Sequence, residues 1–395
     1  MNTKRLFAIL TASALLVGTL AGCGGSKDAS TSGSGGETGT VKDVQVWATG
    51  SDNVRQTFEK LVSDFNANSE YVGTYEAKLN FILSGTGGGT LADQLVAAYK
   101  AGQTDTEFDV VDLGDDDLTK ILSLTDESVL EDLDMSKIPN AEGVTAEPVA
   151  AKGKIQPYRG TTVILAYNSE TVPEDEVPTT MDELVEWIKA HPGRFAYNTP
   201  GTGGAGDSFV RTSIYNFIDD DSALMSSDPK WMEQWDEGFA FLKELHPYMY
   251  KSGSSVVYPN KNQGTLDLLT QGEIDMCPNW ADMVLSQRKA GTVPEKIKIT
   301  TIEPSFTGSV QGIAVPSYSG NKEGGFAFID YLLSPEAQTI LVQDMAAIPL
   351  VTEGVDLTGA EELMSMDVSN FRTQALGDLV TDLNARWDEE IGTLG

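Results

Sequence analysis

Short apolar strands and amphipathic helices alternate along this sequence from about residue 44 onward. Residues 44–50 (VQVWATG), 77–83 (AKLNFIL) and 108–114 (FDVVDLG) have the apolar character of buried strands. Between the first two, apolar residues recur at helical spacing from Val54 to Phe65. Strands that alternate with helices of this length form parallel α/β units whose sheet is covered on both faces. The sequence therefore predicts an α/β fold with parallel-rich sheets.

Two further strands indicate how the domain is divided. Residues 157–169 (PYRGTTVILAYNS) predict a strand long enough to cross between two lobes, and the chain crosses again near residues 308–317. Capping boxes at residues 90–93 (TLAD) and 180–183 (TMDE) mark helix starts. A chain of 395 residues is long enough for two domains. These features predict two lobes joined by crossover strands.

Residues 1–22 predict a lipoprotein signal peptide. Lys4 and Arg5 precede an apolar stretch at residues 6–20, which is too short to cross a bilayer comfortably, since about 20 residues are needed. The stretch ends in LAGC, which resembles the bacterial lipobox. The resemblance implies that Cys23 is diacylated and holds the protein on the extracellular face of the cell membrane. A simple secretory signal with an incidental cysteine is the alternative.

The segment after the signal peptide differs in composition from the rest of the chain. Residues 23–42 are small and polar, and such a segment cannot bury enough apolar surface to fold. We expect a flexible Gly/Ser tether there, followed by a folded domain at residues 43–395. Apart from Cys23, Cys277 is the only cysteine in the sequence, so we expect no internal disulfide bond.

The charge balance is strongly acidic, with 59 Asp and Glu against 27 Lys and Arg and a formal net charge of −32. This balance argues against a nucleic-acid partner, because phosphate contacts need clustered Lys and Arg. A cationic ligand is compatible with it, although net charge reports on solubility more directly than on any site.

Residues 194–212 (RFAYNTPGTGGAGDSFVRT) place four glycines within six residues, between a short strand and a helix. Three interpretations compete: a hydrolase nucleophile at Ser208, a phosphate-binding loop, or a ligand pocket built from backbone. A nucleophilic serine needs a base within reach, and only His191 and His246 exist, without the Asp-x-x-His pattern expected of such a hydrolase. A phosphate-binding loop needs a lysine at the end of the glycines, and this loop has none.

The ligand-pocket interpretation of this loop is therefore preferred. Glycine permits a close approach that larger residues block, so Gly203, Gly204 and Ala205 are expected to bring the free N–H groups of the next helix near a ligand. Asp207 is expected to cap that helix. A loop that serves only as a flexible turn is the alternative.

Other candidate residues lie at similar positions, where a strand ends and a helix begins. Residues 84–87 (SGTG) hold this position in the opposite lobe, and Trp47 lies near the end of the first strand, where it could stack on a ring or occupy the core. The chain around Trp280 is expected to leave a strand at Pro278 and enter a helix. The predicted ligand-binding residues are Trp47, Thr49, Ser84, Gly85, Thr86, Gly87, Tyr158, Arg159, Gly203, Gly204, Ala205, Trp280 and Asp282.

Several charged candidates have two interpretations each. Arg159, at the first crossover, could pair with a ligand anion or with a carboxylate of the protein. Asp282 could pair with a cation or cap a helix. The acidic residues 114–117 (GDDD) could hold a cation, but a solvated helix N-terminus, which favours negative charge, is the simpler interpretation. No cluster of His and Cys supports a zinc site, and we expect no metal and no cofactor.

Five segments, taken in order, resemble the bacterial extracellular solute-binding proteins. They are the lipobox, the strand VQVWATG, the pair TVILAYNSE and TTMDELVEWIKAHPGRFAY, and the closing segment GIAVPSYSGNKEGGFAFIDYLLSPEAQTIL. The resemblance covers essentially the whole mature chain and is strongest for the branch that includes iron, polyamine and thiamine receptors.

This resemblance implies a two-lobe periplasmic-binding-protein-like fold of type II with crossover hinge strands. Lobe 1 would span about residues 43–156 and 310–345, and lobe 2 about residues 168–305, with the C-terminal helices unassigned. It also implies a monomeric receptor, not an enzyme, that closes on a small solute and delivers it to the permease of an ABC transporter. A secreted lipoprotein hydrolase using the same cleft is the alternative, and an adhesion or sensor module is a third. Whether the solute is a sugar, a polyamine, a thiamine-like cofactor or a metal chelate stays open.

Overall fold

The strand expected at residues 44–50 is β1 (Lys42–Gly50), the first element of the fold. The structure, a computed structural model, describes residues 40–395 apart from 85–88, 145, 359, 367–371 and 395. The signal peptide, Cys23 and nearly all of the tether therefore lie outside the described residues. Within these residues no helix combines the length and the apolar character that crossing a membrane requires.

The remaining elements are as follows. The other strands are β2 (Tyr75–Leu83), β3 (Val110–Leu113), β4 (Ile155–Asn168), β5 (Lys251–Ser252), β6 (Ser255–Val256), β7 (Met276–Trp280), β8 (Ile297–Thr300), β9 (Gly308–Ala314) and β10 (Ile348–Pro349). The helices are α1 (Asp52–Asn68), α2 (Leu91–Lys100), α3 (Asp115–Leu124), α4 (Met181–Ala190), α5 (Gly204–Tyr215), α6 (Asp236–Leu245), α7 (Lys261–Gln271), α8 (Ala281–Lys289), α9 (Lys322–Leu332), α10 (Pro335–Met345), α11 (Glu361–Ser365) and α12 (Leu379–Trp387). Both predicted capping boxes are confirmed, at the starts of α2 and α4.

The first half of the fold is built on the parallel strands β1, β2 and β3. Side chains alternate along a strand, so Val44 and Val46 of β1 pack in one core with α1 and α9, while Trp47 faces the opposite side. There, Leu95 of α2 and Leu118 of α3 belong to a second core. Helices thus cover both faces of the sheet, as the alternating sequence pattern predicts.

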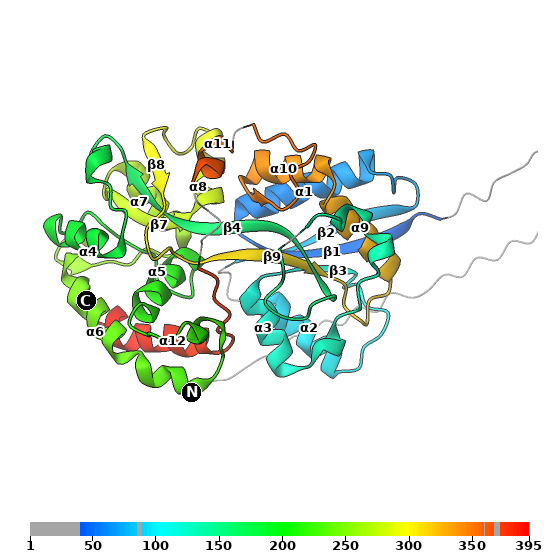
Figure 1. Cartoon of the computed structure of the whole chain (residues 1–395), viewed down its shortest axis with the longest axis horizontal. Helices are drawn as coiled ribbons and strands as arrows, with labels where there is room; N and C mark the ends of the chain where they lie inside the picture. The colour runs from blue at the N-terminus through cyan, green and yellow to red at the C-terminus, as the bar shows by residue number, and fades with distance from the viewer. Residues whose placement is uncertain (1–39, 85–88, 145, 359, 367–371, 395) are drawn as a thin grey trace, which may run out of the picture. The chain divides into compact units, whose positions relative to one another are not determined.

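The long strand β4 takes part in both halves of the fold (Figure 1). Its first part pairs antiparallel with β9, and its last part pairs antiparallel with β7 and β8. In that last part, Val163 and Leu165 enter one core, and Ile164 and Ala166 enter another. The prediction that this segment crosses between halves is confirmed. The sheet is mixed rather than parallel-rich, because β7, β8 and β9 run back against β4.

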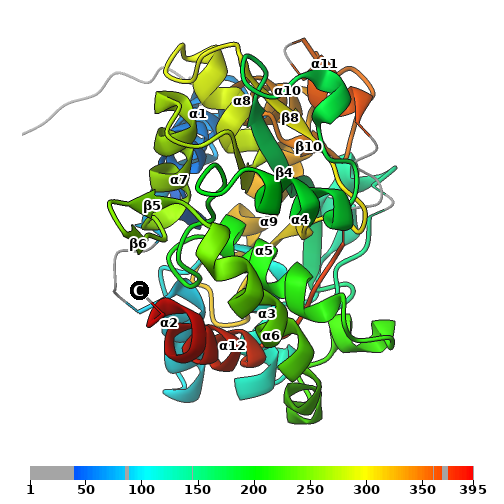
Figure 2. The same ribbon diagram turned by 90° about the vertical axis from the view of Figure 1, so that its left-hand side faces the viewer.

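The second half of the fold surrounds the end of β4 with α4 to α8. The C-terminal helix α12 also belongs there, beside α6 (Figure 2). Leu383 and Trp387 of α12 are buried in the same core as Phe239 of α6, and Arg386 pairs with Asp236 at 2.6 Å. The sequence pattern had not assigned this helix to either lobe.

Two local predictions about the second half are wrong. Pro278 does not break the strand, since β7 continues through it to Trp280. Asp207 does not cap α5, because that helix begins earlier, at Gly204, with Gly203 as its N-cap. The carboxylate of Asp207 instead accepts a hydrogen bond from the amide of Gly201, at 2.8 Å, and so closes the glycine loop.

Candidate functional site

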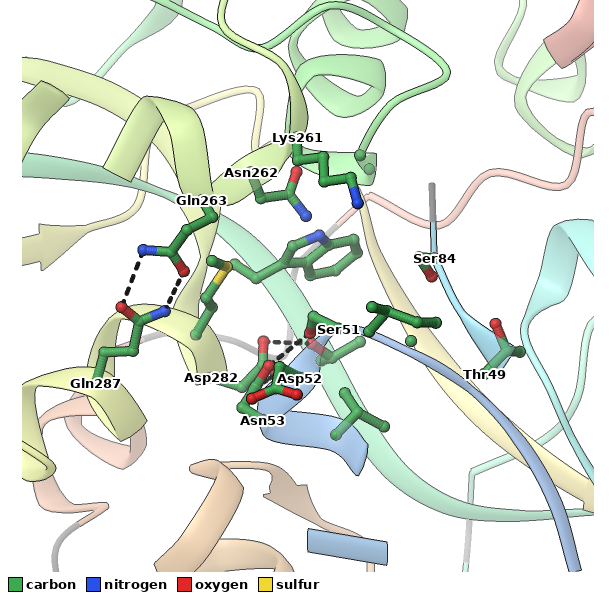
Figure 3. Close-up of a pocket in the computed structure, with 18 of the residues that line it drawn as sticks. Thr49, Ser51, Asp52, Asn53, Ser84, Lys261, Asn262, Gln263, Asp282 and Gln287 are labelled. Carbon is green, nitrogen blue, oxygen red and sulfur yellow. Dashed lines mark hydrogen bonds between the residues drawn. The ribbon is translucent and has the colours of Figure 1, made fainter. Parts of the chain in front are cut away.

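A cavity of about 390 Å³ lies between the two halves, next to the point where β4 crosses (Figure 3). This is within the range of small-molecule sites, about 300–1,000 Å³. The lining residues come from both halves and are mostly amides, hydroxyls and glycines. They are Thr49, Gly50, Ser51, Asp52, Asn53, Val54, Leu83, Ser84, Arg159, Thr161, Thr202, Gly203, Gly204, Lys261, Asn262, Gln263, Trp280, Asp282, Met283, Gln287 and Gln311.

Four helices present their N-termini to this cavity. Asn53 lies in the first turn of α1, Gly204 begins α5, Asn262 lies in the first turn of α7, and Asp282 lies in the first turn of α8. The N-terminus of a helix carries unsatisfied N–H groups and a partial positive charge. The cavity is therefore suited to a ligand rich in hydrogen-bond acceptors.

Arg159 supplies a buried cation to the cavity. The pairing of β4 with β9 shifts register between Pro157 and Arg159, so Tyr158 is an extra residue in a bulge. Tyr158 is fully buried and donates a hydrogen bond to Asp112 at 2.9 Å, while Nε of Arg159 donates to the Tyr158 hydroxyl at 3.0 Å. These two hydrogen bonds fix the guanidinium of Arg159. Its terminal nitrogens form no hydrogen bond to another described residue. Burial raises the pKa of the Asp112 carboxyl, and the charge of Arg159 opposes that shift.

Asp282 supplies a buried carboxylate to the same cavity. It accepts hydrogen bonds from the Asn53 amide at 3.0 Å and from the Thr161 hydroxyl at 3.3 Å. Asn53 belongs to α1 and Asp282 to α8, so this bond joins the two halves. Burial raises the pKa of the Asp282 carboxyl, and Arg159 again opposes the shift. A buried cation and a buried carboxylate thus face one space, which suits a ligand that both donates and accepts hydrogen bonds.

The glycines before α5 allow close packing at this end of the cavity. A Cβ atom at Gly204 would lie 2.8 Å from the indole of Trp280, and one at Gly203 would lie 2.5 Å from the side chain of Asn262. At Gly206 a Cβ would lie 1.9 Å from the carbonyl oxygen of Asn198. The glycines therefore let the start of α5 pack against its protein neighbours, and Gly203 and Gly204 also line the cavity.

The family model of bacterial extracellular solute-binding proteins matches residues 60–369, more than half of the chain. The chain belongs to this family. A comparison with curated proteins found no match.

Solved structures of other solute-binding proteins share the fold of this one. A solute-binding protein of an ABC transporter from Thermotoga lettingae, bound with α-D-tagatose, is 15% identical with a TM-score of 0.65, covering 89% of this chain and 95% of its own. A spermidine/putrescine transporter substrate-binding protein from Streptococcus pneumoniae is 14% identical with a TM-score of 0.62, covering 88% and 99%. A Trichodesmium protein in complex with iron and citrate is 16% identical with a TM-score of 0.60, covering 88% and 98%. This solute-binding protein therefore has the two-lobe fold of periplasmic binding proteins.

The structure brings together only some of the residues predicted to bind ligand. Those that line the cavity are Thr49, Ser84, Arg159, Gly203, Gly204, Trp280 and Asp282. Gly85, Thr86, Gly87 and Cys23 lie outside the described residues.

Trp47, Tyr158 and Ala205 are not among the lining residues. Trp47 donates a hydrogen bond to the carbonyl of Glu107 at 2.8 Å and packs on Phe108, because its side chain leaves β1 on the face covered by α2 and α3. Tyr158 is buried beneath Arg159. The amide of Ala205 donates to the side chain of Asn262 at 3.1 Å, so that N–H group is already used.

Sequence reasoning missed most of the polar residues of the cavity. They are Ser51, Asp52, Asn53, Thr161, Thr202, Lys261, Asn262, Gln263, Gln287 and Gln311, all of them neutral except Asp52 and Lys261. The start of α1 carried the same signal as the glycine loop, since Ser51 and Asn53 directly follow the end of β1. The side-chain amides of Asn262 and Gln263 in α7 and of Gln287 in α8 match no sequence motif.

The hydrolase interpretation of Ser208 finds no support. Ser208 does not line the cavity, and its buried hydroxyl accepts a hydrogen bond from the amide of Thr307 at 2.8 Å. Nδ1 of His191 contacts the Trp187 carbonyl oxygen, and Nδ1 of His246 contacts the hydroxyl of Tyr258, each at 2.9 Å. Ser208 therefore positions the start of β9 and is not paired with a base.

The acidic residues at the start of α3 lie at another contact between the halves. Asp116 forms an ion pair with Arg211 of α5 at 2.8 Å. Burial, with Asp116 nearby, raises the pKa of Asp115 to about 7. Among the described residues there is no cluster of three or more His, Cys, Asp or Glu that could hold a metal ion.

Proposed function

We propose that this solute-binding protein binds a small, hydroxyl-rich solute of the sugar type in the cavity between its halves. The observation that carries the proposal is the lining: the indole of Trp280 beside Arg159, Asp282 and neutral amides. An aromatic ring provides an apolar face for a sugar ring, and groups that donate and accept side by side match its hydroxyls. Of the solutes of the related structures, the sugar of the Thermotoga lettingae protein fits this lining best.

The protein acts by binding, without catalysis. Its site offers hydrogen-bond donors and acceptors from helix starts, and the only histidines, His191 and His246, are outside it. The bound solute is passed to the permease of an ATP-driven importer, as in ABC transporters served by this family.

The protein is held at the outer face of the cell membrane by lipid on Cys23 and works there as a monomer. The lipobox LAGC supports the lipid anchor, and residues 23–42 then act as the tether. Labelled fatty acid should be incorporated into the wild type and not into Cys23→Ala. A wild-type protein that takes up no label would contradict the lipid anchor and leave the solute site unaffected.

The solute class is tested by the shift of the thermal unfolding midpoint with a panel of monosaccharides, amino acids and polyamines. A ligand at 100 times its Kd stabilises the folded state by about 2.7 kcal/mol, which is readily measured. We expect stabilisation by members of the sugar group. Stabilisation by polyamines or amino acids alone would contradict the proposal.

A further inference from the structure

A second cavity, which we name the outer groove, adjoins the candidate site and lies between α1 and α8. It has a volume of about 820 Å³. Asp52, Asn53, Gln263 and Gln287 come from both halves of the fold and line both spaces, so the two cavities adjoin each other. The outer groove is therefore the adjoining space for any part of a solute that extends beyond the inner cavity.

Two glutamines mark the boundary between the spaces. Gln287 of α8 donates to Gln263 of α7 at 2.7 Å, and Gln263 donates back at 3.2 Å (Figure 3). This pairing holds both amides in one orientation where the two spaces adjoin. Each amide oxygen accepts one bond from its partner and has a second lone pair available to a ligand hydroxyl.

The charged side chains of the outer groove contact partners of opposite charge. Lys60 of α1 and Lys289 of α8 both contact Asp344, and Asp52 pairs with Arg55 at 2.8 Å. A polyamine would need an excess of carboxylates here, and an anionic chain would need an excess of cations, whereas the lining holds two lysines and two aspartates. Neutral hydroxyl and amide groups, such as those of Thr57 and Ser286, make up much of the rest of the lining.

We propose that the solute is an oligosaccharide of two or more rings. Its first ring lies against Trp280 in the inner cavity, and the following rings pass the Gln263–Gln287 pair into the outer groove. This inference rests on the proposed sugar-binding function and deepens it. The outer groove is then a second subsite, and its size sets the length of the oligosaccharide that is recognised.

The test is titration calorimetry with α- and β-linked gluco-, manno- and galacto-oligosaccharides of one to four rings. In at least one linkage series, affinity should rise about tenfold or more from one ring to three, as two added hydrogen bonds imply. Gln56→Trp and Ser286→Trp, which narrow the outer groove from opposite walls, should remove this rise and leave the affinity for one ring unchanged. Glu59→Trp, on the same helix as Gln56 but not lining the groove, is the matched control and should bind as wild type does.

The outcomes separate the inference from the function on which it rests. Equal affinity for one ring and for longer chains, in folded protein, would overturn the second subsite while supporting sugar binding. A chain-length effect that persists in both tryptophan variants would also overturn it. Binding of no carbohydrate of any length would overturn the proposed function itself.

Discussion

Trp280 is the residue whose position best explains the chemistry assigned to the cavity. It ends β7, immediately precedes α8, and is half-buried between the glycine loop and the open space. Its sequence context indicated a ligand platform, whereas Trp47 had an equally good context and packs on Phe108 instead. The difference lies in what covers each side of the sheet, and no pattern in the strand itself reports that.

Replacing Trp280 tests the platform at the residue scale. Trp280→Leu should weaken binding of the preferred sugar about tenfold or more, because the aromatic face is lost, whereas Trp280→Phe should retain much of the affinity. Calorimetry measures both, with thermal unfolding as the check on folding, since the indole also contacts two cores. Unchanged affinity in a folded Trp280→Leu protein would refute the platform role.

The glycine loop allows a second test, of packing rather than binding. Gly206→Ala places a Cβ 1.9 Å from the carbonyl oxygen of Asn198, so the backbone must move. We expect the free energy of unfolding to fall by at least about 2 kcal/mol. Gly89→Ala, where the added Cβ meets nothing within 4 Å, should change it far less. Urea unfolding of the two variants makes the comparison, and equal stability would mean that close packing at Gly206 does not require a glycine.

At the scale of elements, the sequence predicted the strands and helix starts well and the site only in part. Periodicity located β4, and capping boxes located α2 and α4, because these signals depend on neighbouring residues alone. The amides Gln263 and Gln287 could not be found this way. They meet where the two cavities adjoin only because α7 and α8 pack in one core with the same part of β4.

The start of α3 predicts how stability depends on pH. The pKa of Asp115 is raised to about 7 in the folded protein, mainly by burial. Between about pH 4, near the pKa of an unfolded Asp, and pH 7, the folded protein therefore keeps a proton that the unfolded chain has lost. The free energy of unfolding falls as pH rises through this window.

Asp115→Asn should remove the contribution of Asp115 to this decline in the free energy of unfolding. The variant should match wild type near pH 4 and exceed its free energy of unfolding by up to about 4 kcal/mol at pH 8, since the pKa is raised by about 3 units at about 1.4 kcal/mol each. Glu237→Gln, on the exposed surface of α6, is the control, and its free energy of unfolding should equal that of wild type at both pH values. Urea titrations at the two pH values make the comparison, and a variant less stable than wild type at pH 8 would show that the charged form is stabilised.

At the scale of the whole molecule, the arrangement of β4 and β9 relates the fold to solute capture. Both strands pass beside the cavity, and contacts such as Asn53–Asp282 and Arg211–Asp116 join the halves around it. A solute that contacts both halves favours their approach, which is the hinge closure expected for receptors of this kind.

Closure is measured by small-angle scattering. The radius of gyration should be smaller with a saturating sugar than without it, and a sugar that does not bind should leave the profile unchanged. An identical profile at saturation would exclude hinge closure while leaving the binding site in place.

The central claim is that the cavity between the halves holds the solute. The most direct test is mass spectrometry under non-denaturing conditions, on protein purified without unfolding. It measures the mass of the solute that is bound to each variant. Wild type should carry a carbohydrate, and Thr49→Trp, which fills the cavity from the end of β1, should carry none while remaining folded. The same carbohydrate retained by folded Thr49→Trp would place the solute elsewhere and contradict the account.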